Sequence, residues 1–154
     1  MLTALKEIME RALAGSAASN EAREHGIELA TALLLVEVAR ADYEEDLTED
    51  KRITALLQRH FGLSNDELQL LVEDARSQAD HAASLQSFTR ELHQKLSLAE
   101  KHHIVEMLWQ VAFADGHLDK HEDHLVRKIA GLLYVGQSDL IRIRNQVHPS
   151  FQDS

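Results

Sequence analysis

Residues 111–129, VAFADGHLDKHEDHLVRKI, decide how this chain is built, because they join the apolar end of one helix, a short acidic loop and the start of another helix. A looser copy of this stretch occurs earlier, where residues 38–42, VARAD, repeat residues 111–115, VAFAD. After a loop that is one residue longer in the first copy, five apolar residues fall in register: Ile53, Leu57, Phe61, Leu63 and Leu68 with Leu125, Ile129, Leu133, Val135 and Leu140. We therefore predict that residues 30–71 and 103–143 form two copies of one helical unit.

The composition favours an all-α fold in a single domain that spans residues 1–154. The chain has only 6 glycines and 1 proline, and aromatic residues make up 5%, which suits helices better than an antiparallel sheet with its many turns. No stretch rich in Pro, Gly or Ser divides the sequence, so we expect one core.

Charge and cysteine content restrict the function. A formal charge of -10 disfavours nucleic-acid binding, because an acidic surface repels the phosphate backbone. The absence of cysteine excludes thiolate metal sites and a cysteine nucleophile, and is compatible with the reducing cytoplasm, where we expect the protein. The longest apolar run, residues 32–36, is far too short to cross a bilayer, and residues 1–14 carry charges that a signal peptide lacks. We expect no direct membrane insertion.

Capping signals predict where several helices begin and end. Two capping boxes pair a serine with a glutamate three residues later: Ser64 with Glu67, and Ser97 with Glu100. Thr48 is the expected N-cap of a helix that runs to Phe61 and stops at Gly62. The helix that starts after Ser64 is predicted to end near Ala79, with a break over residues 80–84.

The two acidic loops are the candidate functional site. Asp42 and Asp115 each end an apolar helix, and each is followed by further carboxylates. If the two loops converge, their oxygens suit calcium, magnesium or manganese. The alternative is structural, because Asp119 and Glu122 also fit a capping box and the helix dipole favours acids there. Neither loop has the alternating ligands of an EF-hand.

Histidines add a second metal hypothesis. His117, His121 and His124 lie among these acids. His121 and His124 are one helical turn apart, so with a carboxylate they offer nitrogen and oxygen ligands for zinc, although the His-Glu-x-x-His pattern is absent. The simpler interpretation is that they are surface histidines at a helix start.

Three residues in apolar helices raise the question of burial. Trp109 and Phe113 are one helical turn apart and are predicted to anchor the core. Glu37 lies five residues before Asp42; inside the core it would need a partner or a raised pKa, and we expect it to face solvent instead.

The repeated motif, above all ADGHLDKHE at residues 114–122, resembles the TerB-like family of bacterial helical domains, named for a tellurite-resistance protein. In the first copy Tyr43 replaces the usual glycine after the aspartate. The resemblance covers residues 25–147 and implies a bundle of about seven or eight helices with an internal pseudo-twofold repeat. The flanking parts are then an N-terminal helix and loop at residues 1–19 and a tail at 150–154. The motif match carries over five acidic positions: Asp42, Glu49, Asp115, Asp119 and Glu122.

The resemblance implies a role in tellurite or other metal stress, through divalent-metal binding or protein contacts. We therefore expect a non-enzymatic module that binds a divalent cation or a protein partner through its acidic loops. One alternative is a metal-assisted hydrolase with Glu37 or Glu122 as base. Another is a purely structural interaction domain, including a homodimer. No nucleophile, oxyanion-binding group or phosphate-binding loop is visible in the sequence, which favours the non-enzymatic module.

Overall fold

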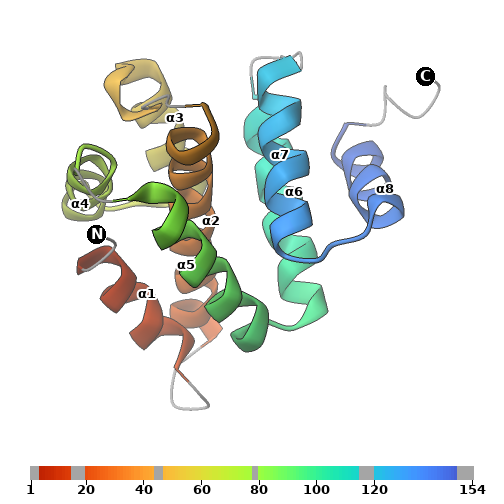
Figure 1. Ribbon diagram of the computed structural model, residues 1–154, viewed down its shortest axis with the longest axis horizontal. Coiled ribbons are helices and arrows are strands. Elements are labelled where there is room, and N and C mark those ends of the chain that lie inside the picture. The colour runs from red at the N-terminus through yellow and green to blue at the C-terminus, as the bar shows by residue number, and fades with distance from the viewer. Residues whose placement is uncertain (1–3, 15–19, 44–46, 78–79, 115–119, 149–154) are drawn as a thin grey trace. The chain divides into compact units, whose positions relative to one another are not determined.

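The computed structural model describes residues 4–14, 20–43, 47–77, 80–114 and 120–148. Within these ranges the chain is helical without strands, which confirms the all-α prediction (Figure 1). By contacts the chain divides into two compact units, residues 1–88 and 89–154, and the boundary falls inside α5. The helices are α1 (Ala4–Leu13), α2 (Asn20–Tyr43), the 3₁₀ helix η1 (Leu47–Glu49), α3 (Lys51–Phe61), α4 (Asn65–Ala75), α5 (His81–Lys95), α6 (Leu98–Ala112), α7 (Lys120–Leu132) and α8 (Gln137–Val147). The single domain stays a prediction.

The first unit is built around α2. Every residue from Leu29 to Ala39 is buried, as expected of a helix that is apolar on all sides. Helices α1, α3 and α4 and the short η1 pack against it, and α1 also touches α4. Because no side of this segment, residues 29–39, faces water, any polar side chain in it must find its partner inside the protein.

The second unit is built around α6, which packs against α7 and α8. Trp109 is completely buried, and its indole N–H donates to the carbonyl oxygen of Leu140 at 3.1 Å. Its ring stacks on that of Phe113 with centroids 5.9 Å apart. The prediction that both aromatic residues anchor the core is confirmed.

The matched positions of the repeat behave alike. All five apolar residues of the second copy are buried, and in the first copy Leu57, Phe61 and Leu63 are buried while Ile53 and Leu68 are half-buried. The helix ends match as well. Gly62 after α3 and Tyr134 after α7 both have left-handed backbone, with φ of 60° and 61°. The following amides close equivalent turns, Leu63 to Gln58 O at 3.1 Å and Val135 to Ala130 O at 2.9 Å.

Both predicted capping boxes are present. Ser64 and Glu67 begin α4, and Ser97 and Glu100 begin α6, each pair with reciprocal hydrogen bonds between side chain and backbone.

Two predicted helix limits are wrong. The N-cap of α3 is Asp50, whose carboxylate accepts from the Arg52 amide at 2.8 Å, because η1 takes up Thr48 and buries it. Helix α4 ends at Ala75, and α5 begins at His81 because Asp80 accepts from the amides of Ala82 and Ala83.

Within the described ranges, no helix combines the length and the apolar content needed to cross a membrane.

Candidate functional site

Three of the predicted ligands lie in described parts of the acidic loops. Asp42 is exposed in the last turn of α2, and Glu49 is exposed at the end of η1. Glu122 is half-buried in the first turn of α7. The helix dipole favours Glu122 at its position but disfavours Asp42, because the carboxyl end of a helix already carries negative potential. Asp42 is therefore the acid whose place helix electrostatics do not explain.

The other predicted ligands cannot be placed. Asp115, His117 and Asp119 lie outside the described residues, and His121 belongs to α7 but its side chain is not described. Among the side chains that are described, no three His, Asp or Glu are arranged to hold a metal ion. Convergence of Asp42 with Asp115 stays a prediction.

The N-cap of α3 shows which loop acid has a structural task. Asp50 accepts from the backbone N–H of Arg52, and this bond, followed by the Arg52 side chain, holds the pKa of Asp50 below its usual value. The neighbouring Glu49 is not the cap. Glu49 is exposed at the end of η1.

The expectation that Glu37 faces solvent is wrong. Its side chain is 1% exposed, because it lies in the fully buried segment of α2. Its Oε2 is 2.6 Å from His81 Nδ1 at the start of α5. Burial, and then the nearby Asp74 carboxylate at the end of α4, raise the pKa of Glu37 to about 9. Glu37 is thus protonated at neutral pH and closed off from solvent.

Sequence reasoning missed Asp74 and His81 as partners of Glu37. Asp74 offered one signal, since it follows Leu71 by three residues on the buried face of α4. His81 gave no signal in the sequence, because it contacts Glu37 from a position 44 residues further along the chain.

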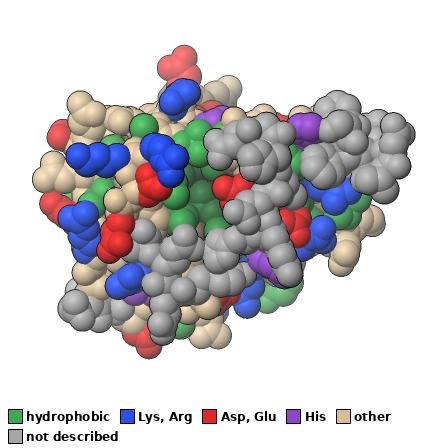
Figure 2. All heavy atoms as spheres, turned by 90° about the horizontal axis from the view of Figure 1, so that it is seen from above, with side chains coloured by type: hydrophobic (Ala, Val, Ile, Leu, Met, Phe, Trp, Pro, Cys, Tyr) green, Lys and Arg blue, Asp and Glu red, His purple; other side chains and the backbone are tan. Residues whose placement is uncertain are grey.

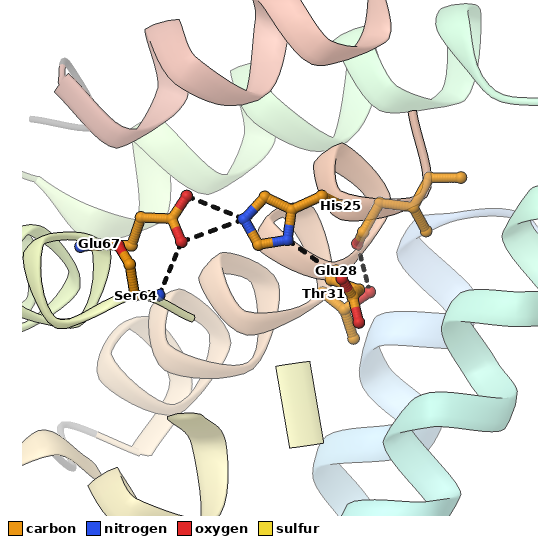
Figure 3. A network of polar contacts seen from close by, with 6 residues as sticks. His25, Glu28, Thr31, Ser64 and Glu67 are labelled. Carbon is orange, nitrogen blue, oxygen red and sulfur yellow. Dashed lines mark hydrogen bonds and ion pairs between the residues drawn. The ribbon is translucent and has the colours of Figure 1, made fainter. Parts of the chain in front are cut away.

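A second polar network joins α2 to the start of α4 (Figure 3). His25 lies between two carboxylates: Nδ1 is 3.1 Å from Glu28 Oε1, and Nε2 is 2.9 Å from Glu67 Oε2. Burial disfavours the charged ring, but the hydrogen bonds to Glu67 and Glu28 outweigh it and raise the pKa of His25. Burial acts against ionisation of Glu67 too, but the Ser64 amide and His25 outweigh it and lower the Glu67 pKa. This network was also missed.

Charges are mixed on the visible surface. Figure 2 shows Lys and Arg side chains interspersed with Asp and Glu where the face is coloured by residue type. The formal charge is unevenly divided, however: residues 1–88 contain seventeen acidic and eight basic residues, and residues 89–154 contain nine and eight. The first unit therefore carries -9 of the total of -10.

Comparison with known proteins gives one match. The profile of the family described as Tellurite resistance protein TerB matches residues 28–145, which includes both acidic loops and all of α3 to α7. Neither the curated proteins nor the solved structures gave a match. The family match covers most of the chain and contains both copies of the repeat, so the chain belongs to the TerB family.

Proposed function

We propose that the protein is a non-enzymatic module of a tellurite or metal stress response that binds a divalent cation through its acidic loops. The observation that carries the proposal is the place of Asp42. It is an exposed carboxylate at the carboxyl end of α2, where the helix dipole is unfavourable, and it is followed by the exposed Glu49. A cation would offset the negative potential of the helix end at Asp42. The second loop supplies the matching Asp115.

The position of Glu37 argues against the hydrolase alternative. That hypothesis needs a carboxylate base that can reach a metal-bound water. Glu37 is buried and, with a pKa of about 9, holds its proton at neutral pH. It cannot accept a proton from a substrate at the surface. Of the two candidate bases for a metal-assisted hydrolase, Glu37 and Glu122, the first is therefore excluded.

The test is the melting temperature in calcium, magnesium or manganese at millimolar concentration. A cation that binds only the folded protein stabilises it by about 1.4 kcal/mol at tenfold excess over its dissociation constant. We expect at least one of the three ions to raise the melting temperature of the wild type. Asp42→Asn combined with Asp115→Asn should abolish the rise and leave the metal-free protein equally or more stable.

Two controls separate a site from general charge screening. Sodium chloride at matched ionic strength should give a smaller rise than the divalent salt. Glu73→Gln with Glu106→Gln removes one acid from each unit outside the loops, and should keep the divalent effect. If sodium chloride stabilises as well as the divalent salts, or if both double variants respond alike, the cation proposal is wrong.

A further inference from the structure

The contact between α2 and the start of α4 requires a charged histidine. Both ring nitrogens of His25 face carboxylate oxygens, at 3.1 Å from Glu28 and at 2.9 and 3.0 Å from Glu67. A carboxylate only accepts hydrogen bonds, and an imidazole has two N–H donors only when it is protonated. A neutral ring would turn a lone pair toward one of the two acids. The observed geometry is therefore that of an imidazolium held between two helices (Figure 3).

We propose that His25 is a pH-sensitive latch that holds the first turn of α4 against α2 and loosens this contact when the ring loses its proton. Glu67 connects His25 to the start of α4, because the same carboxylate also accepts a hydrogen bond from the Ser64 amide in the capping box. Loss of the proton leaves the capping box intact, but it removes the positive charge and leaves one N–H for two acids, so the attraction across to α2 weakens.

The directions of the pKa shifts agree with this geometry. The pKa of His25 is raised above 6.5, so its contribution to stability is complete below pH 6.5 and is lost as pH rises through the raised value. The pKa of Glu67 is lowered below 4.5, so its contribution is present above pH 4.5 and is lost as pH falls through the lowered value. The latch is thus strongest between about pH 4.5 and 6.5 and opens above that window.

The other end of α4 does not share this pH range. There Asp74 lies beside the buried Glu37, which contacts His81 of α5. Because the pKa of Glu37 is about 9, its carboxyl keeps its proton between pH 6 and pH 8. A rise in pH over that range therefore loosens α4 from its start at Ser64, while its end near Asp74 stays held.

Other charged groups on the helices that pack against α2 and α4 do not replace the latch. Lys6 of α1 pairs with Glu10 on its own helix, and burial and then Arg59 lower the pKa of His60 in α3. The carboxylate of Glu28, which contacts His25, also lies close to the backbone of Gly62: a Cβ at that position would be 3.6 Å from it. The remaining charged residues of these neighbouring elements are Glu7 and Arg11 of α1, Glu49 of η1, Lys51 and Arg52 of α3, and Asp66 and Glu73 of α4.

The latch bears on the first acidic loop through η1, which packs against both α2 and α4. Loosening of α4 therefore affects one of the helices that pack against η1, which carries Glu49. This consequence applies whether or not the loop binds a cation, so the latch does not depend on the proposed function.

The experiment is an NMR titration of His25 combined with hydrogen exchange of α4 in the full chain. In the wild type we expect His25 to titrate above 6.5, and the protection factors of Leu68 to Val72 to fall about fivefold from pH 6 to pH 8, as suits a partly exposed ion pair. Protection of α6 should change less. Glu67→Gln keeps a residue suited to the capping box but removes the charge, and should lower the His25 pKa and flatten the pH dependence of α4.

Glu100→Gln is the matched control, because it makes the same change in the capping box of α6. It should leave the His25 titration unchanged. His25→Gln should give an α4 whose protection is low and independent of pH. The latch is wrong if His25 titrates at the same pH in the wild type and in Glu67→Gln. It is equally wrong if protection of α4 in the wild type falls no more than that of α6.

Discussion

The two units repeat one helical pattern but stabilise it by different chemistry. In the first, α2 buries Glu37, with Asp74 and His81 around it, and this unit carries -9 of the total charge of -10. In the second, α6 buries Trp109 against Phe113, and no described Asp or Glu is buried. The repeat therefore specifies where apolar residues fall, while other core positions differ between the units: the first buries two acids, Glu37 and Asp74, and the second buries Trp109 and the basic Lys101.

The aromatic anchor should give the largest effect. Trp109→Ala removes a completely buried ring and its hydrogen bond to Leu140, and we expect a loss of about 3–5 kcal/mol of unfolding free energy. Urea denaturation followed by circular dichroism measures it. Trp109→Phe keeps a ring beside Phe113 but loses the N–H donor, and should cost much less. A loss below about 1 kcal/mol for the alanine variant would show that the second unit does not depend on this anchor.

The ionisable core should give the next effect, visible as a pH dependence. The folded-state pKa of Glu37 is raised to about 9, so the folded protein binds a proton that the unfolded chain releases above about pH 4.5. Stability should therefore fall as pH rises from 5 to 7, by about 2 kcal/mol from this group. Glu37→Gln stays neutral throughout and should remove that loss.

The single tryptophan provides an internal control for the Glu37 experiment. Trp109 lies in the second unit, so its fluorescence reports that unit, whereas circular dichroism reports the helices of both. We expect the circular dichroism transition to lose its pH dependence in Glu37→Gln, and the fluorescence transition to change less. Equal pH slopes in the wild type and the variant would contradict a buried, protonated Glu37.

The sequence predicted the apolar repeat and many helix ends because these depend on residues close together in the chain. Ser64 with Glu67 is one such signal, since both members lie within one turn. The N-cap of α3 was assigned wrongly because Thr48 and Asp50 both suit a cap, and only the formation of η1 decides between them. The family resemblance was also correct, because its motif is a continuous stretch of residues that can be recognised without knowledge of distant contacts.

The ionisable contacts were not predictable in the same way. His25 meets Glu67 across 42 residues, and Glu37 meets His81 across 44. Apolar periodicity says which face of a helix is buried, but not which residue of a distant helix lies opposite. An acid such as Glu37 in an otherwise apolar segment therefore signals only that a partner is needed. The candidate cation ligands are still less determined by sequence, because a repeated acidic pattern does not say which carboxylates lie close together.

The smallest effects should come from the two matching helix ends, and they should have opposite signs. Gly62 and Tyr134 have the same left-handed φ, which costs a residue with a side chain about 1 kcal/mol. The nearest atoms to a Cβ at Gly62 would be those of the Glu28 carboxylate at 3.6 Å, an ordinary contact, so Gly62→Ala should lose about 1 kcal/mol through its backbone conformation. Tyr134 is 73% exposed, and its ring contacts His93 with centroids 4.4 Å apart. Tyr134→Gly should therefore gain roughly 0.5 kcal/mol, because relief of backbone strain exceeds the entropy that glycine adds to the unfolded chain. Urea denaturation of both variants provides the comparison. If Tyr134→Gly is destabilised by more than about 1 kcal/mol, the contact with His93 outweighs the backbone strain. The two turns would then have the same backbone conformation but different contributions to stability.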